Sequence, residues 1–425
     1  MSLTLLVIFV ILFLLGVPLA VSLGVGVIGT MLIYDIPLNL LPQMMLSSMN
    51  SFLLVAVPLF VLAGSVMAGG GISDRIFSAA QVLFGRYRGG LGHVNIVASA
   101  VFGGISGSSV ADVVSLGKIE IKAMTDRKYP RAYAAATTMA TSTLSSVIPP
   151  SILIIIAAST AGVSVGAALA GGLGPAAVLI VVLMVVNYIV SVRKNYGEVT
   201  RTRFKRGLGV VLASIPALGG PVVILVGMFG GAFTPTEAAA IAVFYSLLVG
   251  AFVYRDMKWR DMPKMIVDAG LTSGTILFIA MVANVATYIF TIDGLPARVS
   301  DWVLSMTTSP IIVMLLMGLI LVFIGTVMDI VAAILLTIPV LMPAALAAGV
   351  DPIHFVVFLV ASLSIGLVTP PVGVALFATS YVSKLPMEVI VRAAVPHYTV
   401  MFVALAILAV FPELITWPAE LLTDR

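Results

Sequence analysis

Two Pro-Pro pairs, Pro149-Pro150 and Pro370-Pro371, lie within apolar stretches of this 425-residue chain. Proline has no N–H, so each pair leaves the carbonyl groups four residues earlier without their helical hydrogen-bond partners. These carbonyls belong to Ser145 and Ser146 in the first stretch and to Gly366 and Leu367 in the second. Bare carbonyls at membrane depth persist only where they face protein, water or an ion. We therefore expect two broken helices whose free peptide oxygens can hold a ligand.

The two breaks belong to an internal repeat. From Pro149 to Pro370 is 221 residues, and the same offset pairs Phe102 and Gly104 with Phe323 and Gly325. A fixed spacing over a long stretch indicates a duplication. A broken helix in corresponding positions of two halves is typical of the binding centre of a secondary transporter.

Backbone carbonyls at the breaks are the predicted cation ligands: Ser145 and Ile148 in one half, Gly366 and Thr369 in the other. Hard cations such as Na⁺ take oxygen ligands. The chain has no cysteine and three scattered histidines, which disfavours a transition metal. The alternative is a pair of kinks whose carbonyls are satisfied by neighbouring helices.

Hydroxyl groups near the expected turns are the predicted substrate ligands, because helix N-termini beside them offer free N–H groups and partial positive charge to a carboxylate. For any single serine the alternative is ordinary helix capping. The candidate substrate-binding residues are Ser106, Ser108, Ser109, Ser146, Ser151, Thr326 and Asp329.

Two acidic residues, Asp112 and Asp329, lie close to the same turns. Acids within a membrane are functional candidates as proton or cation partners. Alternatively, Asp329 caps a helix and Asp112 bonds a nearby hydroxyl. A proton-coupled carrier that uses either residue therefore stays open.

Composition sets the class of protein. The chain is 61% hydrophobic and 9% charged, with a mean hydropathy of +1.20, as expected of a polytopic α-helical membrane protein. The absence of cysteine excludes disulfides and thiolate nucleophiles. No metalloprotease, nucleophile-elbow or P-loop motif is present, so we expect neither an enzyme nor an ATP-driven pump, and no nucleic-acid partner. Residues 3–33 contain no Lys or Arg and are predicted to form a first helix rather than a signal peptide.

Glycine and serine clusters at 103–109 and 325–329 predict two re-entrant hairpins whose tips stop mid-membrane. One-sided apolar stripes at 72–83 and 295–306 predict two arm helices in the interface plane, with ordinary loop helices as the alternative. Residues 234–237 predict a helix start with a capping box.

The Lys and Arg residues test a topology in which the N-terminus is cytoplasmic and neither hairpin crosses the membrane. It places the loops near 72–93, 117–131, 193–206, 255–264 and 384–392 inside. These loops hold 20 of the 22 Lys and Arg residues, and only Arg298 and Arg425 lie outside, as the positive-inside rule requires. The helix at 209–230 has no counterpart under the offset, so this unpaired helix inverts the second repeat. The C-terminus is then periplasmic.

Several strings resemble the large membrane subunit of tripartite ATP-independent periplasmic (TRAP) transporters over essentially the whole chain. The most specific are Thr-Pro-Thr-Glu-Ala-Ala-Ala at 234–240 and Thr-Pro-Pro-Val-Gly at 369–373, supported by Gly-Ser-Ser-Val-Ala-Asp at 107–112. The resemblance implies a sodium-coupled elevator in the bacterial inner membrane. Its sodium sites would fall near Gly103, Ser106, Ser145, Ile148 and Pro149, and near Gly325, Met328, Gly366, Thr369 and Pro370, where Met328 offers only its backbone carbonyl.

The resemblance also implies at least two Na⁺ ions, a separate four-helix membrane subunit, a periplasmic substrate-binding protein and an organic acid substrate. Sialic acid is favoured over a C4-dicarboxylate or another carboxylate. The expected fold is all-α, with two inverted repeats that each contain a hairpin and a broken helix. Scaffold helices and the first arm occupy 1–90, the first transport half 91–166, scaffold helices including the unpaired one 167–293, the second arm 294–309, the second transport half 310–384, and the last helix with its tail 385–425. The alternatives are a proton-coupled carboxylate transporter and a membrane scaffold that moves no solute.

Overall fold

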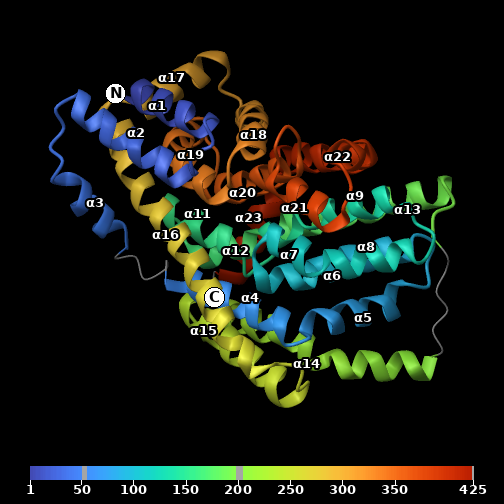
Figure 1. Ribbon diagram of the computed structural model, residues 1–425. Helices are drawn as coiled ribbons and strands as arrows, with labels where there is room; N and C mark the ends of the chain where they lie inside the picture. Colours follow the sequence, from blue (N-terminus) through green and yellow to red (C-terminus); the bar gives the residue numbers. More distant parts are fainter. Residues whose placement is uncertain (50–54, 198–203, 424–425) are drawn as a thin grey trace.

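The computed structural model describes residues 1–49, 55–197 and 204–423 (Figure 1). The described residues form helices and connecting turns, with no strand among them. Within these ranges seven helices are long and apolar enough to cross a membrane, or up to nine if each of two bent helix pairs counts as one span. The predicted class, an all-helical polytopic membrane protein, is confirmed. Arg201, Arg203 and Arg425, which contribute to the predicted topology, and the start of the apolar segment at 52–68 lie outside the described residues.

Among the described residues, thirteen α-helices precede the unpaired one. They are α1 (Ser2–Leu14), α2 (Leu19–Ile33), α3 (Leu40–Met49), α4 (Ala56–Gly69), α5 (Ile72–Phe84), α6 (Gly90–Ser106), α7 (Ser109–Ser115), α8 (Gly117–Thr125), α9 (Arg131–Thr141), α10 (Leu144–Val147), α11 (Ile152–Ala161), α12 (Val165–Gly171) and α13 (Leu173–Arg193).

The unpaired helix is α14 (Phe204–Phe229), which lies at one edge of the molecule in Figure 1. It is followed by α15 (Pro235–Leu248), α16 (Met262–Ile292), α17 (Leu295–Met306), α18 (Pro310–Val327), α19 (Ile330–Ala347), α20 (Pro352–Val368), α21 (Val374–Ser383), α22 (Met387–Val410) and α23 (Glu413–Thr423). A short π-helical turn, Val249–Val253, extends α15.

Helix bounds recur between the two halves. Shifted by 221 residues, the segment that begins α9 and ends α10, 131–147, becomes 352–368, which are the bounds of α20. The same shift brings the end of α6 onto the end of α18 and the start of α11 to within one residue of the start of α21. The repeat indicated by the Pro-Pro pairs therefore extends to the surrounding helices.

The N-terminal segment differs from the prediction. Residues 3–33 do not form one helix, because Gly16 adopts φ 84° and Pro18 starts a new helix, so α1 and α2 fold back on each other. The hydroxyls of Thr4 and Tyr34 lie 3.0 Å apart, and the Ser2 N–H donates to the Asp293 carboxylate at 3.0 Å. Figure 1 shows the N-terminus beside α17. A cytoplasmic N-terminus is thus incompatible with the predicted outside position of the loop that contains Asp293.

The arm helix α5 turns away from α4 by 69°. Of its predicted apolar stripe, Ile72, Ile76, Ala79 and Ala80 are buried, whereas Leu83 is 49% exposed. The stripe therefore faces protein over most of its length. The second arm, α17, begins beside an ion pair between Asp293 and Arg298 (2.6 Å) and buries Val303. Hydrogen bonds from Ser2, followed by Arg298 and the terminal amine, hold the pKa of Asp293 well below its usual range.

The two arms contact different parts of their hairpins. Helix α5 packs along α6, the first arm of its hairpin, whereas α17 packs along α19, the return arm of the other. The repeats are thus alike in helix bounds but not in arrangement.

Arg75 ties the first arm to the loop after α15. Its guanidinium lies 2.6 Å from the Asp256 carboxylate, 2.9 Å from the Gly71 carbonyl oxygen and 3.9 Å from the ring centroid of Tyr254. We expect Arg75→Ala to lower the free energy of unfolding by about 1 kcal/mol, because the ion pair is partly exposed and the ring contact adds to it. Thermal unfolding in detergent measures the effect. Arg86→Ala, which removes an exposed arginine that lies farther from its ring neighbour (5.1 Å), is the matched control and should leave unfolding unchanged.

The predicted capping box is present. The Thr234 hydroxyl accepts the Glu237 N–H, and the Glu237 carboxylate accepts the Thr234 N–H at 2.8 Å, with Pro235 in the first turn. This motif starts α15 and carries no further chemistry.

Candidate cation and substrate site

The first break separates α10 from α11. The helical segment 131–147, which ends with α10, differs in direction from α11 by 44°, and Ile148 between them is extended (φ −73°, ψ 127°). Ser151 caps α11, because its hydroxyl accepts the Ile154 N–H at 3.3 Å. The same hydroxyl donates to the Ser146 carbonyl. The expectation of a bare Ser146 carbonyl is therefore wrong, since a side chain five residues later supplies the missing donor.

The second break separates α20 from α21. Thr369 is extended (φ −97°, ψ 139°), and its N–H donates to the Gly366 carbonyl oxygen at 2.9 Å. The Gly366 carbonyl, predicted to be bare, thus has one partner and one remaining lone pair. The Thr369 hydroxyl donates to the Ile365 carbonyl at 2.6 Å, which leaves the hydroxyl lone pairs and the Thr369 carbonyl as its ligand groups.

The first hairpin meets the first break through backbone. Its two sides, α6 and α7, are joined at Gly107, which adopts φ 58°. A Cβ placed on Gly103 would lie 2.5 Å from the Ser145 Cα, and one on Gly104 would lie 3.0 Å from the Pro149 carbonyl oxygen. Only glycine allows this approach, so the end of α6 lies directly against the peptide groups that the prolines expose.

The second hairpin meets the second break in the same way. A Cβ on Gly325 would lie 2.6 Å from the Leu363 carbonyl oxygen and 3.1 Å from the Gly366 Cα. The Gly373 N–H donates to the Thr326 carbonyl at 2.9 Å, while the Thr326 hydroxyl is used within its own helix. Met328 ends α18 in an extended conformation and is partly buried. Gly325, Thr326 and Gly366 are thus brought together.

The serines of the first half separate into two groups. Ser108 and Ser151 are helix caps, the alternative that the sequence left open. The Ser109 and Ser146 hydroxyls lie 2.7 Å apart and are buried. The hydroxyls of Ser106 and Ser145 are also buried and have no hydrogen-bond partner among the described residues. These last two are available to a bound ion.

The two breaks differ in exposure. Pro149 and Pro150 are buried, whereas Pro370 and Pro371 are exposed. Asp329, at the tip of the second hairpin, is also exposed and caps α19 by accepting the Val331 N–H at 2.9 Å. Asp112 lies on α7 and is buried without a hydrogen-bond partner in the described part of the chain.

The two halves interlock around these breaks. Helix α11 packs on α19, and α21 packs on α7. The Ser364 hydroxyl of the second broken helix donates to the Thr143 carbonyl of the first at 3.1 Å. Within the described ranges no three His, Cys, Asp or Glu residues cluster as metal ligands. The donors at the breaks are peptide and hydroxyl oxygens, a set that suits an alkali cation rather than a transition metal.

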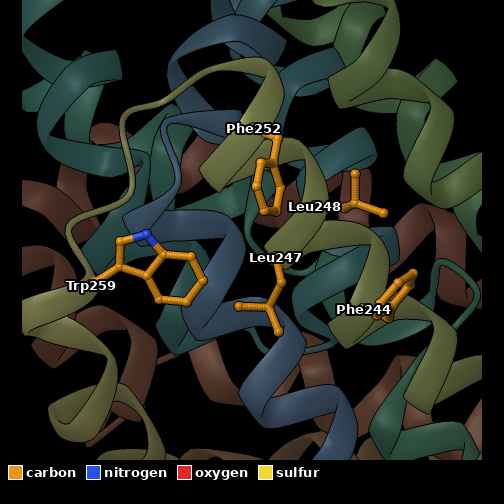
Figure 2. Close-up of a pocket in the computed structure, with 5 residues that line it drawn as sticks. All are labelled: Phe244, Leu247, Leu248, Phe252 and Trp259. Carbon is orange, nitrogen blue, oxygen red and sulfur yellow. The ribbon is translucent and has the colours of Figure 1, made fainter.

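A hollow of about 550 Å³ lies elsewhere, along α15 and the loop after it (Figure 2). Its lining consists only of apolar side chains, Phe244, Leu247, Leu248, Phe252 and Trp259, and four of the five are exposed. No polar side chain there is placed to bind an anion. The hollow is therefore not the substrate site.

Residues 6–414 match the family model described as "Tripartite ATP-independent periplasmic transporter, DctM component". The chain belongs to this family. It is the large permease subunit of a TRAP transporter, a multi-pass membrane protein and not an enzyme. The family resemblance stated from the motifs is confirmed.

The TRAP relatives are similar over nearly the whole chain. The large permease protein SiaM of a sialic acid TRAP transporter from Vibrio cholerae is 35% identical over 399 residues, which cover 94% of this chain and 93% of SiaM. The isethionate TRAP permease protein DctMQ of Oleidesulfovibrio alaskensis is 34% identical over 401 residues, 94% of this chain but 63% of DctMQ. Among solved structures, the Alcanivorax borkumensis YdaH transporter superposes with a TM-score of 0.58 at 13% identity and covers 88% of this chain and 90% of YdaH. This likeness concerns the fold alone.

Proposed function

We propose that this TRAP permease couples the inward movement of sodium to uptake of an organic acid by an elevator mechanism across the bacterial inner membrane. The observation that carries the proposal is the pair of glycine-mediated contacts between a hairpin and a helix break, one in each repeat. Each contact assembles peptide oxygens that Na⁺ can use in place of its water ligands.

Two sodium sites are proposed, one at each contact. The first uses oxygens of Gly103, Ser106, Ser145, Ile148 and Pro149, and the unpartnered hydroxyls of Ser106 and Ser145 support it. The second uses Gly325, Met328, Gly366, Thr369 and Pro370. Because Thr369 already donates its N–H to the Gly366 carbonyl, the second lone pair of that oxygen is the one proposed to face the ion.

The substrate is proposed to lie between the hairpin tips. The starts of α7, α11 and α19 offer N–H groups there, and Ser108, Ser151 and Asp329 cap them, so the capping side chains would adjust as the substrate enters. Ser106, Ser109, Ser146 and Thr326 complete the proposed contact set. SiaM is named for sialic acid, a carboxylic acid, and DctMQ is named for isethionate, a sulfonic acid. At 35% and 34% identity these two relatives do not discriminate between the acids, and we propose sialic acid, favoured from the sequence, as the substrate to test first.

The moving part is proposed to comprise residues 91–166 and 310–384. Residues 1–90, which include the first arm, and residues 167–293 then form the scaffold. Residues 294–309 are the second arm, and 385–425 are the last helix with its tail. The interlocked packing of α11 on α19 and of α21 on α7 supports a single moving body.

The Lys and Arg distribution and three contacts support an inverted topology with a revised N-terminus. Arg75 forms an ion pair with Asp256, and the predicted topology places both of their loops on the cytoplasmic side. Helix α23 packs on α12, and the predicted topology places both helices on the periplasmic side. Ser2 bonds Asp293 in a loop placed outside. We therefore propose that the N-terminus and the C-terminus are both periplasmic.

The natural absence of cysteine makes this orientation testable. Leu3 is 74% exposed, so a thiol at Leu3→Cys should react with a membrane-impermeant maleimide added to intact spheroplasts. Arg255→Cys, in the exposed loop beside Asp256, is the control and should react only after the membrane is permeabilised. The opposite labelling pattern would refute the revised orientation.

Two partners are proposed, a small four-helix membrane subunit and a periplasmic protein that delivers the substrate. The family description names a tripartite, periplasmic system, and DctMQ is longer than the region that this chain matches. These facts support a small membrane subunit as a partner of the permease.

The energetics allow strong accumulation. If two Na⁺ ions accompany one monovalent anion, a tenfold sodium gradient gives about 1.4 kcal/mol per ion. The net positive charge adds about 2.3 kcal/mol per 100 mV. Together these contributions support accumulation of roughly several thousandfold.

The test is uptake of radiolabelled sialic acid into proteoliposomes that contain both membrane subunits, with the periplasmic protein outside. Replacing external sodium by choline should abolish uptake. Undiminished uptake in choline would refute sodium coupling. Uptake that follows a pH gradient without sodium would establish proton coupling. Sodium-dependent uptake of a different acid would keep the coupling and replace the substrate.

A further inference from the structure

A second cluster of polar groups lies inside the first half, beyond the helix break. Asp112 on α7 and Glu120 on α8 are 1% and 0% exposed. All four carboxylate oxygens are buried and lack a hydrogen-bond partner among the described residues. The two groups are close enough to act electrostatically on each other. Two ionised carboxylates cannot share such a site without a cation.

The Ser99 hydroxyl presents oxygen rather than hydrogen to these carboxylates. Ser99 lies beside both acids, and its proton is donated to the Thr141 hydroxyl at 3.2 Å. Thr141 in turn donates to the Asn95 side-chain oxygen at 2.6 Å. The lone pairs of Ser99 are therefore left between the carboxylates. Two buried carboxylates and a hydroxyl oxygen form an all-oxygen group of the kind that hard cations bind.

The second repeat shows that the fold does not need this cluster. Shifted by 221 residues, Asp112 becomes Ala333, Glu120 becomes Leu341, and Thr138, which lies beside Glu120, becomes Leu359. These three counterparts are buried apolar side chains. The same helical framework thus packs with a hydrocarbon core in one half and with two acids in the other. Packing of this framework therefore does not require the two acids.

We propose that Asp112, Glu120 and Ser99 form a third cation site that takes a sodium ion, in addition to the two sites at the helix breaks. The proposal rests on the proposed sodium coupling and extends it. Ca²⁺ prefers six to eight oxygen ligands, more than two carboxylates and one hydroxyl provide. Ser145, which lies beside Asp112 and also belongs to the first break, connects the third site to the first.

The test is a count of ²²Na⁺ ions bound at saturation by the purified complex of this chain with its small membrane subunit, without transport. Glu120→Gln, which keeps the shape of the side chain, should bind one Na⁺ fewer than the wild type. Asp126→Asn, which removes an exposed acid just after α8, is the matched control and should bind the wild-type number.

A second variant tests the same site in case Glu120→Gln does not fold. Asp112→Ala combined with Glu120→Leu carries the residues that the second repeat packs at the same positions, and it too should lose one Na⁺. An unchanged count in both variants would overturn the third site. Loss of ⁴⁵Ca²⁺ binding in place of ²²Na⁺ would overturn the choice of ion. A wild-type complex that binds no ²²Na⁺ would refute the proposed sodium coupling as a whole, which separates the two failures.

Discussion

Uptake by Gly366→Ala is expected to fall by about a hundredfold or more, equivalent to roughly 3 kcal/mol. The added Cβ would overlap the Val322 carbonyl oxygen and lie 2.8 Å from the Gly325 Cα. Both atoms belong to backbone, which cannot rotate away as a side chain can. The methyl group therefore has to separate α18 from α20, and with them the second hairpin from the second break. Overpacking of this kind costs about 1–3 kcal/mol of stability, so the variant should still fold.

The measurement is initial uptake into proteoliposomes, combined with thermal unfolding of the same preparation. Gly270→Ala in α16 is the matched control, because a Cβ there meets no heavy atom within 4 Å. Alanine at that helical position should preserve uptake and raise stability by up to about 1 kcal/mol. Normal uptake by a well-folded Gly366→Ala protein would show that close contact between hairpin and break is dispensable.

Replacing Pro149 and Pro150 together by alanine should also reduce uptake by about a hundredfold, but without loss of stability. Each alanine favours a helix over proline by about 3 kcal/mol, and it restores an N–H. Helix α10 can then continue into α11, where the new N–H groups cover the Ser145 carbonyl and remove Ser151 from its capping position. The protein would keep its fold and lose its first ion site.

Uptake, ²²Na⁺ binding and the unfolding temperature together distinguish this result from misfolding. Pro221→Ala is the control, since Pro221 lies inside α14, a helix that stays continuous across it. The control should transport at the wild-type rate. If the double alanine variant transports normally, the break at Pro149 and Pro150 has no role in ion binding.

Much of the fold could be predicted from local signals. Proline and glycine act on the backbone within a few residues, so the Pro-Pro pairs and the Gly-rich turns marked helix ends that the structure places close to the predicted positions. The 221-residue offset then related distant helices without any knowledge of their packing. Hydropathy alone was less reliable, because residues 3–33 are apolar throughout and yet turn at Gly16 and Pro18.

The rest depended on tertiary packing. Residues 117–131 contain five Lys and Arg residues and were assigned to a loop on the inner side, whereas the structure forms α8 there and buries Glu120 against its neighbours. No local pattern distinguishes a buried glutamate from an exposed one in a charged segment. A polar residue whose counterpart in the other repeat is apolar, such as Glu120 against Leu341, was the signal that could have found it.

The two arms pack against different parts of their hairpins, α5 along α6 and α17 along α19. This difference bears on how the proposed elevator would change from one side of the membrane to the other. The two repeats share an architecture but pack differently against their arms. A second state of the protein would result if each repeat adopted the packing now seen in the other. The exposed prolines of the second break and the buried prolines of the first would then exchange surroundings. The site would then open to the opposite side of the membrane by an exchange of conformations that the two repeats already have.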